Sequence, residues 1–108
     1  PEFEEIGRHL GAIDVVFMPV GAYEPRWFMR PVHMNPEEAV DAFGSITAPN
    51  PDHPTVMIAM HWGTFILTDE PPDEPPGRAV NAWRAERRPA DRLWVFAPGE
   101  TRALSSAP

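Results

Sequence analysis

The sequence predicts an α/β fold, and in particular half of a layered α/β domain. Three short apolar runs, over 14–20, 55–60 and 92–97, are too brief for buried helices and are typical of buried strands. Three segments with helical periodicity or capping signals alternate with them, one before each run. No glycine-rich phosphate loop follows any of these runs, so the pattern does not indicate a complete doubly wound nucleotide-binding unit.

Composition limits the chain to one domain or a part of one, because it has 108 residues. A net charge of −7 argues against a broad nucleic-acid-binding face, and the absence of cysteine excludes disulfides and thiolate metal sites. No run approaches the roughly 20 apolar residues of a membrane span, and no signal peptide is recognisable. We therefore expect a cytoplasmic protein, either free or peripheral at a membrane. The first residue is proline rather than methionine, so we expect the chain to be part of something larger.

The first predicted element is a helix over 3–10, because apolar residues recur there at i, i+3 and i+7. Gly11 is placed to end this helix. The strand over 14–20 follows, and we expect it to be covered on both faces, as in parallel or mixed sheets. Pro19 near its end marks the point where the hydrogen-bond ladder should stop.

Residues 21–34 have no period and contain glycine and proline, so they are predicted to form a loop. This loop is unusually rich in large apolar side chains, among them Trp27, Phe28 and Met29. Such loops either pack under another part of the protein or line a pocket, and the pattern leaves both alternatives open.

The second helix has the most definite start signal, in "NPEEAVDAF". Asn35 can cap it, Pro36 suits the first helical position, and Glu38 can bond back to the cap. The turn over 47–54 should end this helix and lead into the strand over 55–60. Within this turn, His53 is expected to be a solvated residue.

Residues 68–77, "TDEPPDEPPG", are acidic and proline-rich and are predicted to be an irregular surface loop, with a partner-binding segment as the alternative. A third helix should follow over 78–88, with Trp83 on its buried side. Three arginines near its C-terminal end are expected on the solvent side, where they would offset the helix dipole or, alternatively, bind phosphate: Arg84, Arg87 and Arg88. The tail over 103–108 is expected to be frayed.

His61 follows directly on the apolar run of the second strand, in "VMIAMHWGTF". It is either a core histidine bonded to a nearby carbonyl or a metal ligand at the edge of the sheet. Ligands gather at the carboxyl ends of strands in open α/β sheets, and the loop "GAYEPRWF" after the first strand should lie at the same edge. The residues alone leave both readings of His61 open.

Three stretches, "PVGAYEPRWFM", "VHMNPEEAV" and "MIAMHWGTFILTDEPPDEPP", resemble the C-terminal part of the metallo-β-lactamase-fold hydrolases. More narrowly, the chain is similar to the zinc-dependent N-acylphosphatidylethanolamine-hydrolysing phospholipase D group and its bacterial relatives. The resemblance implies an αββα metallo-β-lactamase-type sandwich with a two-zinc site at one edge. Residues 1–108 would be the C-terminal portion of that single domain, and the N-terminal half with the metal motif is absent from this chain.

The resemblance also implies roles for individual residues. His61 stands where the family has its last metal ligand, a histidine at the end of a strand. His33 falls where the family has a histidine facing the phosphate and acyl-amide region of the substrate. Trp27, Phe28 and Met29 would then form part of an apolar wall for acyl chains.

Other expectations follow from what the chain lacks. The His-x-His-x-Asp-His motif, a further histidine and the bridging aspartate of the family are missing, whereas zinc needs three or four protein ligands. We therefore expect the chain to be inactive alone, and to associate with a missing N-terminal half, with a partner chain such as a second copy, or with the other piece of a cleaved protein. Glu24 and Arg26 are expected to form an ion pair that holds their loop.

The function expected of the intact protein is zinc-dependent hydrolysis of a phosphodiester bond in a phospholipid like N-acylphosphatidylethanolamine. A lactonase or another phosphoesterase of the same fold is an alternative. The rival from another class is a non-catalytic C-terminal module for packing or assembly, in which His61 is structural. No residue is a convincing nucleophile, because the serines lack a partnered histidine: Ser45, Ser105 and Ser106.

Overall fold

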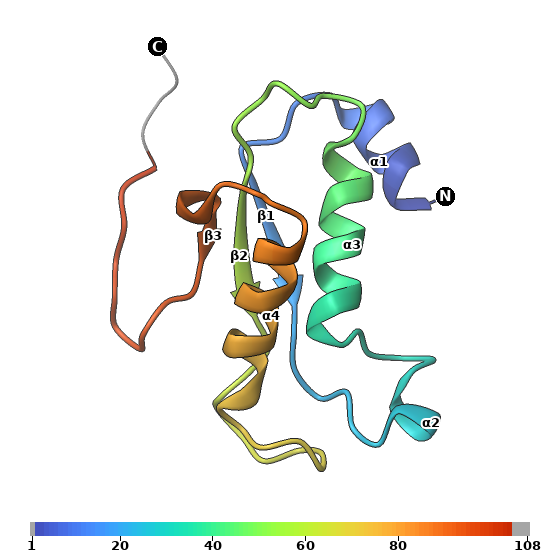
Figure 1. The fold of residues 1–108 in the computed structure, drawn as a ribbon, viewed down its shortest axis with the longest axis vertical. Coiled ribbons are helices and arrows are strands. Elements are labelled where there is room, and N and C mark those ends of the chain that lie inside the picture. The colour runs from blue at the N-terminus through green and yellow to red at the C-terminus, as the bar shows by residue number, and fades with distance from the viewer. Residues whose placement is uncertain (1, 105–108) are drawn as a thin grey trace.

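The computed structural model describes residues 2–104, in which helices and strands alternate along most of the chain (Figure 1). The elements in chain order are α1 (Glu2–Leu10), β1 (Val15–Pro19), α2 (Arg26–Met29), α3 (Pro36–Thr47), β2 (Val56–Met60), α4 (Glu74–Ala85), the 3-10 helix η1 (Ala90–Arg92) and β3 (Leu93–Trp94).

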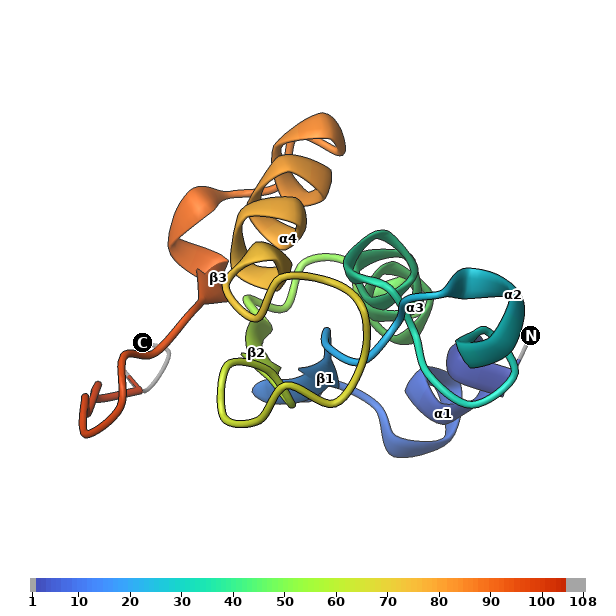
Figure 2. The same cartoon turned by 90° about the horizontal axis from the view of Figure 1, so that it is seen from below.

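The three strands form one parallel sheet in the order β1-β2-β3. Helix α3 lies between β1 and β2 in the chain, and α4 lies between β2 and β3, so the fold contains two consecutive β–α–β units. Both helices lie on the same side of the sheet (Figure 2). The predicted α/β class is therefore confirmed.

The core lies between this helical layer and the sheet. Met18 of β1 and Met57 of β2 are buried there with Val40 of α3. Phe43 of α3 and Trp83 of α4 meet with ring centroids 5.1 Å apart. Each large apolar side chain buried in this way contributes about 1.5–3 kcal/mol, so the packing of these side chains between helices and sheet stabilises the fold substantially.

The other face of the sheet is covered unevenly in the described part of the chain, because Val56 and Ile58 of β2 are buried on it, at 1% and 9% exposure. Phe17 of β1 points to that face and is 58% exposed, and it is in register with Ile58 of β2. The prediction that the first strand is covered on both faces is therefore wrong for β1. The reason is that α3 and α4 supply one covering layer, on the opposite face (Figure 2).

The start of α3 follows the predicted capping box. Asn35 Oδ1 accepts a hydrogen bond from the Glu38 amide at 2.8 Å, and Glu38 Oε1 accepts one from the Asn35 amide at 3.0 Å. Pro36 occupies the first turn, where a missing N–H leaves no bond unmade. These local contacts explain why this boundary was correctly placed from sequence alone.

Helix α4 begins at Glu74, four residues before the predicted start, so the irregular loop predicted over 68–77 is wrong for its last four residues. Its prolines lie in the first turn, where the N–H groups have no partner within the helix. The helix ends at Ala85 rather than at residue 88, and Arg87 then adopts a left-handed φ of 56°.

Strand β3 is shorter than predicted, because only Leu93 and Trp94 pair with β2. Beyond them the chain doubles back, and Arg102 Nη2 donates to the Val95 carbonyl at 3.5 Å. The Arg102 guanidinium also lies over the rings of Trp94 and Phe96, at 5.6 and 5.1 Å from their centroids. In the segment after β3, these side-chain contacts take the place of further backbone pairing with β2.

Two further expectations for single side chains are wrong. Arg88 is half-buried over the rings of Phe43 and Trp83, at 5.5 and 5.6 Å, whereas Arg84 and Arg87 are exposed as expected. His53 is half-buried rather than solvated, and its Nε2 lies 2.7 Å from Asp14 Oδ1.

The prediction of a frayed tail lies outside the described residues for 105–108, and with it the expectations for Ser105 and Ser106. Ser45 lies in α3, where its hydroxyl donates to the Asp41 carbonyl at 3.3 Å. Among residues 2–104, no helix is long and apolar enough to span a bilayer.

Candidate functional site

The carboxyl ends of β1 and β2 lie at one edge of the sheet, because the strands are parallel. The segments that follow these strands, 20–24 and 61–70, contact each other. The Val20 amide donates to the Met60 carbonyl at 3.0 Å, and the Asp69 amide donates to the Glu24 carbonyl at 3.1 Å. This edge is where ligands bind in open parallel sheets, and it carries the predicted site residues.

His61 is the first residue after β2, and its side chain is exposed. Its φ of 66° lies in the left-handed region, which costs roughly 1–3 kcal/mol for a residue with a Cβ. Gly21 lies directly against it: a Cβ at Gly21 would be 2.1 Å from the His61 carbonyl oxygen. A glycine at this position therefore allows the end of β1 to approach the backbone of His61.

His33 comes from a different segment, just after α2. Its amide donates to the Met29 carbonyl at 2.9 Å. The centroid of its ring is 5.4 Å from that of His61, and the two planes are inclined by 32°. Its Nδ1 atom is buried and has no hydrogen-bond partner among the described residues. The structure therefore brings two of the predicted site residues together.

Arg26 fixes the backbone of His33. Its Nη1 donates to the carbonyls of Tyr23 and His33 at 3.3 and 3.2 Å, and its Nη2 pairs with Glu38 at 2.6 Å. The predicted Glu24–Arg26 ion pair is therefore wrong. Glu24 instead accepts a hydrogen bond from the Arg26 backbone amide at 3.1 Å.

The three apolar residues predicted to form a wall for acyl chains all lie in α2 but do not share one surface. Trp27 and Phe28 are 83% and 64% exposed, with ring centroids 5.7 Å apart in an edge-to-face arrangement. Met29 is buried. Only the pair that points outward is available to a ligand in this structure.

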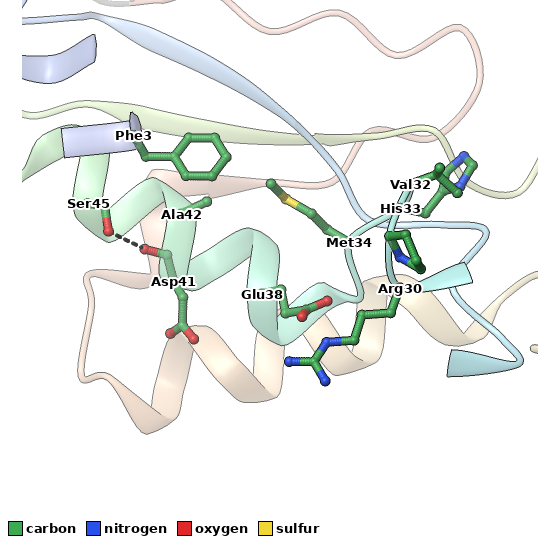
Figure 3. Close-up of a pocket in the computed structure, with 10 residues that line it drawn as sticks. Phe3, Arg30, Val32, His33, Met34, Glu38, Asp41, Ala42 and Ser45 are labelled. Carbon is green, nitrogen blue, oxygen red and sulfur yellow. Dashed lines mark hydrogen bonds between the residues drawn. The ribbon is translucent and has the colours of Figure 1, made fainter. Parts of the chain in front are cut away.

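A cavity of about 460 Å³ lies between α1, α3 and the segment that carries His33 (Figure 3). Phe3 and Met34 give it apolar walls, and Arg30 and Asp41 bring opposite charges to its rim. His61 lines a different cavity, of about 320 Å³, with four neighbours from the segment after β2: Trp62, Thr64, Phe65 and Leu67.

The described residues do not complete a metal site. Among residues 2–104, no group of three or more histidine, cysteine, aspartate or glutamate side chains is arranged to hold a metal ion. His61 can supply one imidazole, whereas a zinc site takes three or four protein ligands. The remaining ligands of any metal here would have to come from outside these residues.

Glu70 is a residue of this edge that sequence reasoning missed. Its carboxylate accepts hydrogen bonds from the amides of Ala22, Tyr23 and Glu24 at 2.7, 3.2 and 2.9 Å, and from Thr68 Oγ1 at 2.6 Å. Partial burial raises the pKa of this carboxyl, but the bonds from Thr68 and the amides outweigh burial and hold it below its usual value. In the sequence nothing distinguishes it from the other acids of an acidic loop.

Tyr23 connects the same edge to both helices of the layer. Its buried hydroxyl donates to Glu74 Oε1 of α4 at 2.5 Å, and burial, followed by this hydrogen bond, raises the pKa of the phenol. Arg78 lies over the Tyr23 ring at 4.6 Å and pairs with Glu37 of α3. The loop after β1 is thus held by α3 and α4 together.

Comparison with known proteins gives a family match over the first part of the chain. A family model described as "Beta-lactamase superfamily domain" matches residues 1–62. The N-acyl-phosphatidylethanolamine-hydrolyzing phospholipase D 1 of Caenorhabditis elegans is 47% identical over 66 residues, which are 61% of this chain and 17% of that protein. The mitochondrial N-acyl-phosphatidylethanolamine-hydrolyzing phospholipase D of Saccharomyces cerevisiae is 34% identical over 56 residues, 52% of this chain and 11% of that protein.

An uncharacterized protein of Mycobacterium tuberculosis is 38% identical over 84 residues, which are 78% of this chain and 21% of that protein. The chain therefore spans about a fifth or less of the length of these curated relatives.

Proposed function

The chain belongs to the beta-lactamase superfamily, and on that premise we propose that it is the C-terminal portion of a zinc-dependent phosphodiesterase. The proposed substrate is a phospholipid like N-acylphosphatidylethanolamine. Two relatives, from worm and yeast, are named for hydrolysis of this lipid, which supports the choice. The observation that carries the proposal is the meeting of His33 and His61, with ring centroids 5.4 Å apart, at the edge where parallel sheets bind ligands.

His61 is the residue of this chain that would hold the metal. Its side chain is exposed at the end of a buried strand, and its backbone is held in a costly left-handed conformation. Strain of this kind clusters at functional sites, where the surrounding structure enforces it. Bound zinc supplies Lewis-acid activation of water in sites of this kind.

His33 would contact the polar part of the substrate. A buried polar atom without a partner costs about 1–3 kcal/mol, and a polar group of a bound ligand would remove this cost at His33 Nδ1. The outward pair Trp27 and Phe28 would offer apolar surface to an acyl chain. Both roles are part of the proposal.

The rest of the domain would supply the missing metal ligands and a cover for the exposed part of the outer sheet face. Phe17 lies on that face and is 58% exposed in this chain. A second layer packed there would complete the sandwich, in keeping with a chain that spans a fifth or less of its relatives.

A non-catalytic packing module is the second candidate, in which the exposed part of the sheet face binds another part of the protein and His61 is structural. The two candidates differ in the rest of the protein. A His-x-His-x-Asp-His motif upstream of these residues is expected for the enzyme, and its absence from the whole protein would leave the packing module as the function.

The test uses the intact protein, with His61→Ala compared with His53→Ala. His53 pairs with Asp14 before the start of β2, so it serves as a control at the opposite end of the strands. We expect His61→Ala to lose bound zinc and to lower the hydrolysis of N-acylphosphatidylethanolamine at least about tenfold, since even residues behind the ligands have effects of that size. His53→Ala should keep both properties.

His33→Ala provides the second arm. It should keep the bound zinc and lower hydrolysis of the lipid, because its proposed contact is with the substrate. Zinc content and lipid hydrolysis that are both unchanged in His61→Ala would refute the metal role. If the protein hydrolyses a lactone or another phosphodiester in a zinc-dependent way but does not hydrolyse the lipid, the proposed substrate is wrong and the hydrolysed compound takes its place.

A further inference from the structure

We propose that the backbone amides of Ala22, Tyr23 and Glu24 form an anion-binding site, and that the carboxylate of Glu70 is its resident ligand. Through this contact Glu70 acts as a positioning residue for the loop that contacts His61. The importance of that loop for catalysis rests on the proposed function. The anion site itself rests on geometry alone.

Three consecutive amides converge on one carboxylate. The Ala22 amide donates to Glu70 Oε2 at 2.7 Å, whereas the amides of Tyr23 and Glu24 donate to Oε1 at 3.2 and 2.9 Å. Successive amides can point to the same side only where the backbone departs from a regular strand, and Ala22 does so with a φ of 64°. Such a concave group of amides binds anions in many proteins.

Glu70 is held in this position from its own side of the contact. Thr68 Oγ1 donates to Glu70 Oε1 at 2.6 Å. The neighbouring Asp69 amide donates to the Glu24 carbonyl at 3.1 Å, which binds the two segments a second time. The carboxylate therefore completes a contact between the end of β1 and the segment after β2.

The contact extends to His61 through one residue. Gly21 precedes the three amides and lies so close to His61 that a Cβ would be 2.1 Å from the His61 carbonyl oxygen. Any shift of the amides of 22–24 therefore moves the chain against the backbone of His61. Loss of the Glu70 carboxylate should loosen both positions.

The experiment is hydrogen exchange of the intact protein, followed by mass spectrometry of the peptides that cover residues 18–26. Glu70→Ala removes the anion, and Glu70→Gln keeps one oxygen but replaces the other by an amide NH₂, which cannot accept a bond from Ala22. Asp69→Asn is the matched control, because it removes a neighbouring exposed carboxylate and leaves the backbone bond of Asp69 in place.

We expect the amides of 22–24 to exchange at least about tenfold faster in Glu70→Ala, with a smaller increase in Glu70→Gln and none in Asp69→Asn. Formate, a small carboxylate, should restore slow exchange in Glu70→Ala, whereas chloride at the same ionic strength should not. If Glu70→Ala does not fold, the comparison of Glu70→Gln with Asp69→Asn decides the result.

The anion site would be overturned if exchange were unchanged in both Glu70 variants. It would also be overturned if exchange were faster in Glu70→Ala and formate did not slow it. Faster exchange throughout β2 as well as in 22–24 would also overturn it, since the effect would then be general unfolding. In the same samples, Glu70→Ala should lower zinc retention and formate should restore it.

Slow exchange at 22–24 that depends on Glu70, in a wild-type protein that binds no zinc, would refute the proposed function and keep the anion site. Bound zinc in the wild type, together with exchange at 22–24 that does not depend on Glu70, would refute the anion site and leave the proposed function standing.

Discussion

At the scale of single residues, the left-handed backbone conformation of His61 is destabilising for a residue with a Cβ, whereas glycine adopts it without strain. The free energy of unfolding of His61→Gly should therefore exceed that of His61→Ala by about 1 kcal/mol, because alanine keeps the strain and glycine removes it. His61→Gly should accordingly unfold at a higher urea concentration. Both variants lack the imidazole, so under the proposed metal role both should lose bound zinc. The measurement is urea unfolding of the metal-free intact protein.

The comparison of glycine with alanine separates strain from side-chain contacts, because both substitutions remove the same ring. Equal stability of the two variants would mean that the surroundings of His61 do not enforce its conformation. The strain argument for a functional role of His61 would then fail.

The lowered pKa of Glu70 predicts the sign of a pH dependence of stability. Its folded-state pKa lies below the ordinary value of 4.5, so its carboxylate stabilises the fold above about pH 4.5 and loses this effect as the pH falls through the folded pKa. We expect Glu70→Gln to be less stable than the wild type at about pH 7, and we expect this difference to be smaller at about pH 3, below the ordinary pKa. Urea unfolding at both pH values measures this, and a difference that does not change with pH would contradict it.

Sequence reasoning at this scale named residues better than it named contacts. His33 and His61 were singled out, and the structure places their rings together, although their roles remain predictions. Arg26 was assigned to Glu24 but pairs with Glu38, because a long guanidinium side chain can reach a carboxylate on the next helix. Glu70 could not be identified, since its partners are backbone amides, which the sequence does not distinguish.

At the scale of elements, two glycines with opposite surroundings test how α1 and α4 are packed. A Cβ at Gly7 of α1 would be 2.0 Å from the Ile46 carbonyl of α3, whereas a Cβ at Gly77 of α4 meets nothing within 4 Å. Gly7→Ala should therefore destabilise the protein by about 1–3 kcal/mol by forcing the helices apart. Gly77→Ala should stabilise it by about 0.5–1 kcal/mol through helix propensity.

Thermal unfolding of the two alanine variants gives the comparison directly. A stabilising effect of Gly7→Ala would show that α1 does not pack against α3 in the way described. A destabilising effect of Gly77→Ala would show that the first turn of α4 is covered by another part of the intact protein.

Elements were predictable where local chemistry decides them. The capping box of α3 and the apolar run of β2 carry their signals within a few residues, and both were placed within one residue. The start of α4 was missed because its prolines were interpreted as helix-breaking residues, although the first turn of a helix accepts proline. The length of β3 depends on Arg102 and on a neighbouring strand, so it could not be read locally.

At the scale of the whole molecule, the exposed side chain of Phe17 on the outer sheet face provides a test of whether a second layer covers that face. In the intact protein, Phe17→Ala should lower the free energy of unfolding by about 3 kcal/mol if that layer covers the face. Leu10→Ala, a change at a residue with similar exposure here, should have an effect within about 0.5 kcal/mol. Urea unfolding of both variants measures the difference, and a neutral Phe17→Ala would mean that the face stays in water.

The α/β class was predictable because it depends on the alternation of short apolar runs and helical segments. The state of each sheet face was not, because apolar side chains on both faces of β1 predict burial without naming what covers them. The metal site follows the same rule. His61 is the one candidate ligand that the sequence indicates for the proposed metal site, and ligands from other segments would leave no trace in this sequence.

The segment between Met60 and Glu70 is fixed at both ends on the loop after β1, through the Val20–Met60 bond and the Glu70 carboxylate. Its middle, Phe65, Ile66 and Leu67, is 66–81% exposed and lies between these anchors. Insertions or deletions there would leave both anchors, and therefore the placement of His61, unchanged. The segment is thus the part of this edge whose length and apolar surface can change with the least effect on the two strand ends that it joins.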